Sequence, residues 1–155
     1  MCEKYELLNK QFAALLEGET NVISILSNAS ALLNEALDDI NWVGFYLYDS
    51  ESNELQLGPF QGKVACMHIP MNKGVCGTAA YQRKTQLVSD VHAFEGHIAC
   101  DSASNSEIVI PLIVNNEVYG VLDIDSPSFN RFTELDQKYL EEFSHILTGF
   151  IKNNL

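Results

Sequence analysis

Apolar residues recur at helical spacing near both ends of the chain. Over residues 5–16, and again over 22–37, they repeat every three or four positions, and Gly18-Glu19 separates the two segments. Such a repeat places the apolar side chains on one face of a helix. Residues 133–151 have the same pattern, and Thr133 followed by Asp136 is typical of a capping box. The pattern predicts three amphipathic helices.

The middle of the chain has the composition of a sheet. Its segments are rich in β-branched and aromatic residues and are separated by turn-forming residues such as Asn115-Asn116. A short helical pattern at 74–83 interrupts them. Strands are predicted at 42–48, 54–60, 64–69, 85–88, 108–114 and 118–124.

This order of elements predicts an α+β fold. Hairpin connections favour an antiparallel sheet, and the terminal helices should pack on one of its faces. The chain has 155 residues, which suits a single domain over 1–155. A domain of this size buries roughly 70% of its unfolded-chain surface, so it needs no disulfide to support its core.

The charge of the chain excludes two classes of partner. Nine Lys and Arg residues stand against 21 Asp and Glu residues, a formal net charge of −12. Nucleic acid and anionic membranes both require basic surfaces, so neither is expected as a partner. No apolar run is long enough to span a bilayer, and the first residues lack the pattern of a signal peptide. A cytoplasmic protein is the expectation.

Cysteines are the first candidates for chemistry. Cys66, Cys76 and Cys100 lie within 35 residues, whereas Cys2 stands apart. In a reducing compartment such thiols are more often catalytic or metal-bound than structural. Cys76 follows Lys73-Gly74-Val75 at a predicted helix start, where the helix dipole and the lysine would favour a thiolate. The alternative is that Cys76 is a small buried residue.

The third thiol lies in a long polar connection. Cys100 belongs to residues 89–105, and loops of this length are more often functional than idle. The neighbouring Asp101 should disfavour a thiolate there, and His97 could support one. The alternative is a loop cysteine without a role.

Carboxylates and aromatics complete the candidate site. Asp123 and Asp125 alternate with apolar residues, so they share one face of a strand, and Glu107 alternates in the same way. A solvated sheet face or a Mg²⁺ or Ca²⁺ site would explain them equally. Trp42 and Tyr46 also share a face, either as core residues or as the lining of a pocket.

Four residues could ligate a zinc ion, namely Cys66, Cys76, Cys100 and His97. Structural zinc sites use short knuckles in which two to four residues separate a pair of cysteines. Here Cys66 and Cys76 are 10 positions apart, and Cys76 and Cys100 are 24 apart. We therefore predict no metal site.

Several segments together resemble the free methionine-(R)-sulfoxide reductases, a branch of the GAF domain superfamily. The resemblance covers essentially the whole chain, and three cysteines with an acidic triplet make it specific. The matching segments are WVGFY (42–46), GKVAC (62–66), KGVCGTAA (73–80), HIACDSASNSEIVIPL (97–112) and GVLDIDSPSFNRF (120–132).

The resemblance implies a fold and a reaction. The fold is a six-stranded antiparallel sheet with the terminal helices on one face, a ligand pocket on the other, and usually a homodimer. The reaction is reduction of free L-methionine-(R)-sulfoxide to methionine, with no bound cofactor and with thioredoxin as the external reductant. A sulfenic acid and then an intramolecular disulfide are the implied intermediates.

The resemblance also implies residue roles. Cys100 is the nucleophile, and Cys76 and Cys66 resolve it. Trp42, Tyr46, Glu107, Asp123 and Asp125 bind the substrate, and clustered carboxylates supply a proton for the leaving oxygen. Local electrostatics favour Cys76 as the better thiolate, so the choice of nucleophile, of disulfide and of proton donor stays open. A non-catalytic GAF sensor and a thiol redox switch are the alternative functions.

Overall fold

The computed structural model describes residues 2–98 and 103–155. Four α-helices, one 3₁₀ helix and six strands follow one another along these residues. The helices are α1 (Cys2–Leu16), α2 (Val22–Ala36), α3 (Gly74–Gln82), the 3₁₀ helix η1 (Val91–Ala93) and α4 (Glu134–Asn153). The strands are β1 (Trp42–Asp49), β2 (Glu54–Gly62), β3 (His68–Pro70), β4 (Gln86–Val88), β5 (Ser106–Val114) and β6 (Glu117–Ser126).

The six strands form one sheet in the order β3-β2-β1-β6-β5-β4. Every neighbouring pair is antiparallel, as the hairpin pattern predicted. Asn115 and Asn116 both have positive φ, 52° and 65°, as a tight two-residue hairpin between β5 and β6 requires. The long strands β1 and β6 pair at the centre of the sheet, and consecutive residues of both are buried, so both faces are covered there.

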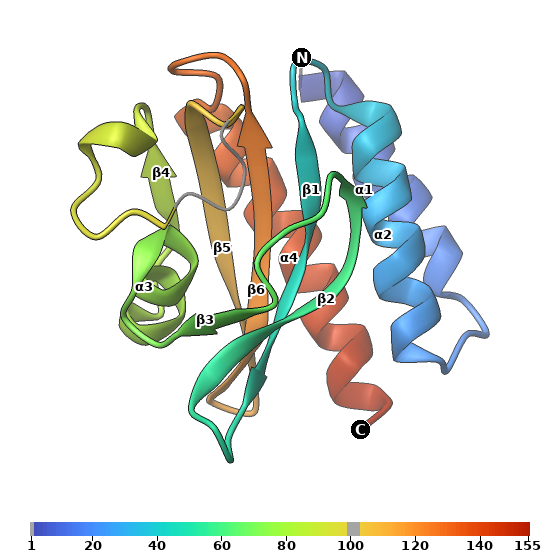
Figure 1. Cartoon of the computed structure of the whole chain (residues 1–155). Helices are drawn as coiled ribbons and strands as arrows, with labels where there is room; N and C mark the ends of the chain where they lie inside the picture. Colours follow the sequence, from blue (N-terminus) through green and yellow to red (C-terminus); the bar gives the residue numbers. More distant parts are fainter. Residues whose placement is uncertain (1, 99–102) are drawn as a thin grey trace.

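Helices cover the two faces unequally. On one face α2 and α4 pack against the sheet and α1 packs against these two helices, whereas α3 lies on the opposite face (Figure 1). Alternation along β1 divides its side chains between the two faces, with Val43 and Phe45 in the first core and Trp42 and Tyr46 in the second. The predicted α+β fold, with its terminal helices on one face, is confirmed.

The last helix begins as the sequence predicted. The side chain of Thr133 accepts a hydrogen bond from the backbone N–H of Asp136, and the Asp136 carboxylate accepts one from the backbone N–H of Thr133. This reciprocal arrangement is the capping box. Of the helices in the described part of the chain, none is both long and apolar enough to cross a bilayer.

The predicted strand at 64–69 is wrong over most of its length. The ladder of β3 covers only His68–Pro70, and residues 63–66 run as irregular backbone between β2 and β3. Side chains take the place of the ladder here. The Trp42 indole N–H donates to the carbonyl of Lys63 at 3.2 Å, and the Tyr46 hydroxyl donates to the carbonyl of Cys66 at 3.0 Å. The alternation of apolar and polar residues does not reveal these side-chain hydrogen bonds, so it predicted a strand here.

Candidate active site

Strand register brings the three predicted carboxylates together. Asp125 on β6 is paired with Glu107 on β5 and with Trp42 on β1, so these three residues form one row across the sheet. Asp123 lies two residues along β6 and therefore points to the same face. The shared face predicted for Asp123 and Asp125 is confirmed.

These carboxylates are buried. Glu107 is 7% exposed, Asp123 5% and Asp125 9%. The alternative interpretation, a solvated sheet face, is therefore wrong. The reason is α3, which packs over this face and shields the carboxylates from water. Buried carboxylates are uncommon unless they are paired, protonated or used in chemistry.

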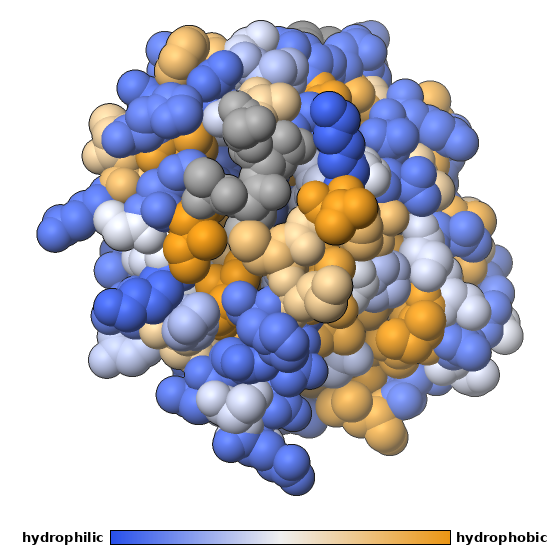
Figure 2. Space-filling view, in the orientation of Figure 1, coloured by the Kyte–Doolittle hydropathy of each residue, from blue (hydrophilic) through white to orange (hydrophobic). Residues whose placement is uncertain are grey.

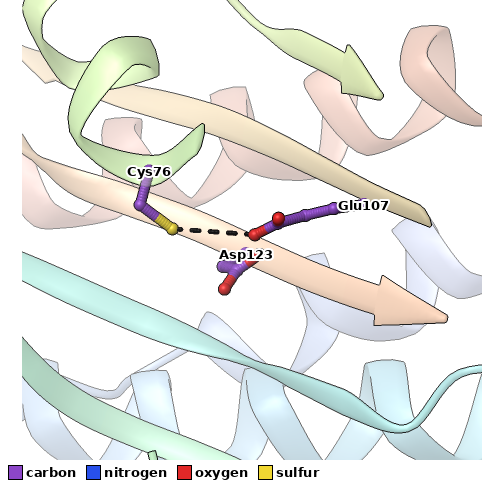
Figure 3. A group of neighbouring side chains, drawn as sticks. All are labelled: Cys76, Glu107 and Asp123. Atoms are coloured by element: carbon purple, nitrogen blue, oxygen red, sulfur yellow. Dashed lines mark hydrogen bonds between the residues drawn. The ribbon is translucent and has the colours of Figure 1, made fainter. Parts of the chain in front are cut away.

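The start of α3 places Cys76 over the carboxylates. At Gly77 an added Cβ would lie 2.4 Å from the carbonyl oxygen of Pro70, so only glycine allows this close approach of α3 to β3. The Cys76 thiol then points down at the sheet and donates to Oε2 of Glu107 at 3.9 Å (Figure 3). Asp123 lies beside both residues on the neighbouring strand.

Burial and the neighbouring carboxylates favour the protonated form of Glu107. The pKa of the Glu107 carboxyl is raised well above its ordinary value, first by burial and then by the nearby Asp123 and Asp125. Burial also raises the pKa of Asp123, while hydrogen bonds from Glu107, Asp125 and Cys76 act in the opposite direction. Glu107 is therefore the group that holds a proton, and Asp123 is the group that accepts hydrogen bonds.

The prediction of a thiolate at Cys76 is wrong. Burial raises the pKa of the Cys76 thiol well above its usual range, and Asp123 and Glu107 raise it further. These effects outweigh the helix dipole, which acts only over the first turn. Cys76 is thus a neutral, buried thiol in the wall of the pocket.

Two aromatics form the adjoining wall. The rings of Trp42 and Tyr46 stack with centroids 5.8 Å apart, and Trp42 also stacks on Phe60 at 5.1 Å. Both Trp42 and Tyr46 line the cavity that contains Cys76 and the carboxylates. Burial and the carboxylates raise the pKa of Tyr46, so its hydroxyl stays a donor to the Cys66 carbonyl.

The cysteines differ in state. Cys66 is half-buried and disulfide-bonded, whereas Cys2 and Cys76 are free thiols. The predicted nucleophile, Cys100, lies outside the described residues. The structure therefore brings Cys76, Glu107, Asp123, Asp125, Trp42 and Tyr46 into one cavity and leaves the position of Cys100 undescribed.

Residues that the sequence analysis did not select also line the cavity. Ala65, Ile69, Ile98 and Ser104 are among them, and their sequence contexts are irregular loops and a short edge strand. His97, which the sequence indicated as possible support for a thiolate, also lines the cavity, and partial burial and then His92 lower the pKa of its imidazole, which favours the neutral form. A neutral imidazole is able to accept a proton from a thiol.

One set of donors within the described residues has the spacing of a metal site. The Cys76 thiol and the carboxylates of Glu107 and Asp123 offer ligand atoms that lie within 4.8 Å of one another. Carboxylate and thiolate ligands together would suit Zn²⁺. Binding requires these groups to lose their protons, and burial opposes that loss.

Comparison with known proteins identifies the family to which this chain belongs. The sequence model of the GAF domain family matches residues 20–152, so the chain is a GAF domain protein. A free methionine-R-sulfoxide reductase from Escherichia coli K12 is 56% identical over 140 residues, which cover 90% of this chain and 84% of the relative. The chain therefore belongs to the free methionine-R-sulfoxide reductase branch of the GAF domain family.

Solved structures of the same branch superpose closely. The Staphylococcus aureus protein of this name, in complex with substrate, has 56% identity and a TM-score of 0.90, with 95% of each chain covered. The free methionine-R-sulfoxide reductase of Neisseria meningitidis, also in complex with its substrate, has 43% identity and a TM-score of 0.94. That comparison covers 97% of this chain and 89% of the Neisseria chain.

Proposed function

We propose that this protein reduces free methionine-(R)-sulfoxide to methionine. The observation that carries the proposal is the buried cluster of Cys76, Glu107 and Asp123 beside two pocket aromatics, in a chain of this reductase branch. Relatives with the same fold are described as complexes with their substrate. A dry cavity with a protonated acid is what cleavage of a sulfur–oxygen bond requires.

The first step is attack by the Cys100 thiolate on the sulfoxide sulfur. The oxygen leaves the substrate as the sulfur–oxygen bond breaks, and it needs a proton. We assign this proton to Glu107, because its raised pKa keeps it protonated near neutral pH. The protonated oxygen transfers to the Cys100 sulfur as the transient bond between the two sulfurs breaks, so methionine departs with its sulfur reduced by two electrons and Cys100 becomes a sulfenic acid.

Other pocket groups hold the substrate. Oδ1 of Asp123 is buried and lacks a hydrogen-bond partner among the described residues, so it supports a role in binding the substrate ammonium together with Asp125. The Trp42 ring is fixed by stacking and by its N–H bond to Lys63, and its face suits the S-methyl group.

Resolution of the sulfenic acid is assigned to Cys66. Its thiol attacks the sulfenic sulfur of Cys100, water leaves, and a disulfide forms. Cys66 is disulfide-bonded in the structure, and Cys76 is a free thiol with a raised pKa, which supports Cys66 over Cys76 in this step. A thiol kept protonated is a poor nucleophile in such exchange.

Recycling completes the reaction. We propose that thioredoxin reduces the disulfide, that no bound cofactor takes part, and that the protein works as a homodimer in the cytoplasm. The steps balance with thiols alone, because each turnover consumes one sulfoxide and one external dithiol and forms one disulfide and one water. A compartment that keeps thiols reduced suits this chemistry.

A substrate comparison tests the proposed function. Purified protein with dithiothreitol as reductant is incubated with free methionine-(R)-sulfoxide, the free (S) epimer or a peptide containing the (R)-sulfoxide, and methionine release is measured. We expect turnover of the free (R) form alone. Tight binding of the free (R) form without turnover would instead support a GAF sensor, and equal thiol oxidation by peroxide would support a redox switch.

A further inference from the structure

The segment that carries Cys66 exposes apolar side chains on both sides of this cysteine. Val64 is 84% exposed and Met67 is 64% exposed, while Cys66 between them is half-buried. In Figure 2, hydrophobic atoms gather at the centre of the face where the link from β2 to β3 crosses the front in Figure 1. Apolar side chains grouped around one reactive residue are characteristic of a binding surface.

The backbone of this segment is already fixed. Trp42 and Tyr46 donate to the carbonyls of Lys63 and Cys66, and the backbone N–H of Leu57 donates to the carbonyl of Met67 at 3.0 Å. The two side-chain hydrogen bonds come from residues that line the cavity and hold the segment in place. The exposed side chains therefore belong to an ordered surface, which binds a partner at a lower entropic cost than a flexible loop.

Charge distinguishes this part of the chain from the rest. Residues 55–89 contain Lys63, Lys73, Arg83 and Lys84 but no Asp or Glu. This stretch thus has a charge of +4 within a chain of −12, and all other residues together have −16. Lys63 and Lys73, both exposed, lie on the two sides of the Cys66 segment in sequence. The exposed Lys63 adjoins the Cys66 segment in the chain, so a partner with an acidic rim gains a favourable charge contact there.

We propose that Lys63, Val64 and Met67 form the docking surface for the dithiol protein that reduces the Cys66 disulfide. This inference rests on the proposed function, in which that partner is a thioredoxin. Thiol–disulfide exchange requires the partner's thiolate to reach a disulfide sulfur, so the contact surface has to surround an accessible cysteine. Such redox contacts are small and transient, with less than about 1,200 Å² buried, and a few apolar side chains suffice.

The exchange at this surface balances as follows. A partner thiolate attacks Sγ of Cys66, the disulfide of Cys66 breaks, and the proposed partner cysteine, Cys100, leaves as a thiolate. The second partner thiol then attacks the mixed disulfide and releases Cys66. The external dithiol loses two electrons and two protons, and the enzyme gains two thiols.

Two reductants separate docking from catalysis. We compare the double variant Val64→Ser, Met67→Ser with the unchanged protein, using either thioredoxin with its reductase and NADPH or dithiothreitol. The KM for thioredoxin should rise about tenfold, and turnover driven by dithiothreitol should be unchanged. The matched control is Leu7→Ser, Ile23→Ser, which removes apolar side chains that are 57% and 56% exposed on α1 and α2. Its KM for thioredoxin should be unchanged.

A charge variant tests the same surface independently. Lys63→Glu should raise the KM for thioredoxin several-fold at low ionic strength, and the difference should shrink as salt is added. A KM within twofold of the unchanged protein in both the double variant and Lys63→Glu would overturn the proposed surface. Absence of turnover with dithiothreitol in the unchanged protein would instead overturn the proposed function.

Discussion

At the scale of single residues, the account depends on one protonated carboxyl. Glu107 lies in a row with Asp125 and Trp42, accepts a hydrogen bond from Cys76 and is almost fully buried. Burial and neighbouring carboxylates both disfavour its charge. The same physical effects that make this residue costly for the fold make it available as an acid near neutral pH.

Replacing this acid should abolish most of the turnover. Glu107→Gln keeps the shape and the hydrogen bonding of a protonated carboxyl but has no proton to transfer. We expect kcat with dithiothreitol to fall by about 10²–10⁴-fold, with substrate binding changed much less. Glu117→Gln, on the exposed end of β6, is the control and should have normal kcat. A kcat for Glu107→Gln within threefold of normal would remove Glu107 from the mechanism.

The same substitution should change the pH dependence of stability. Above the ordinary glutamate pKa of 4.5, the unfolded state has lost the Glu107 proton, whereas the folded state keeps it because its pKa is raised. The unfolded state then binds fewer protons, so the free energy of unfolding falls as pH rises, by up to about 1.4 kcal/mol per pH unit. The contribution of the Glu107 carboxyl to the free energy of unfolding is fully present below the pKa of this group in the unfolded state. It declines as pH rises from that value to the pKa in the folded state.

Urea unfolding from about pH 5 to about pH 8 measures this slope. Glu107→Gln should flatten it, because the variant has no proton to lose at this position. Glu117→Gln should retain the slope of the unchanged protein. An identical slope in Glu107→Gln and the unchanged protein would mean that Glu107 is ionised in the folded state.

The carboxylates and the aromatic residues of the cavity were predictable from the sequence, but the thiolate predicted at Cys76 was wrong. Alternation placed Asp123 and Asp125 on one face, and register then set Glu107 beside them. Cys76 has the local signature of a reactive thiolate, a helix start preceded by a lysine. Its raised pKa results first from burial between α3 and the sheet and then from Asp123 and Glu107, and Glu107 is 31 positions away in sequence, so neither effect is local.

At the scale of elements, the link between β2 and β3 is held by hydrogen bonds from two residues that line the cavity. Trp42 and Tyr46 line the cavity with one part of each side chain and hold the backbone around Cys66 with another. Under the proposed function, the same two side chains bind the substrate and position the backbone of the resolving cysteine. Strand periodicity predicted a strand over residues 64–69, and most of this prediction was wrong because side-chain hydrogen bonds take the place of a ladder before β3.

Removing one of these hydrogen bonds should make residues 63–67 less ordered while the aromatic ring stays in the pocket. Tyr46→Phe keeps the ring but leaves the Cys66 carbonyl without its donor, at a cost of about 0.5–1.5 kcal/mol. Hydrogen exchange of peptides covering residues 63–67 should become faster, and resolution of the sulfenic acid should slow. Tyr48→Phe is the control, because the Tyr48 hydroxyl bonds only Asn53 in the exposed turn between β1 and β2. Unchanged exchange in Tyr46→Phe would show that this bond does not order the segment.

At the scale of the whole molecule, the sequence predicted the architecture well. Hairpin turns, alternation and helix periodicity are local signals, and together they are sufficient for an antiparallel sheet with the terminal helices on one face. The order of strands was not predicted, because β1 pairs with β6 across more than 70 intervening residues. The cavity results from this long-range pairing, which brings Trp42 to Asp125.

The proposed homodimer is a prediction at the same scale. One chain has a mass of 17.3 kDa, so the assembly should have twice that mass, 34.6 kDa. Light scattering after size-exclusion chromatography over a range of concentrations measures this mass directly. A value of 17.3 kDa at every concentration would contradict the dimer and leave the single-chain mechanism intact.

The most direct test of the central claim is a single turnover without any external reductant. Fully reduced protein is mixed with one equivalent of free methionine-(R)-sulfoxide, methionine is quantified, and the disulfide is mapped by mass spectrometry after alkylation. The account predicts one methionine per chain, a disulfide between Cys66 and Cys100, and a free Cys76. Absence of methionine would contradict the reductase, and a disulfide through Cys76 would contradict the assignment of Cys66 as the resolving thiol.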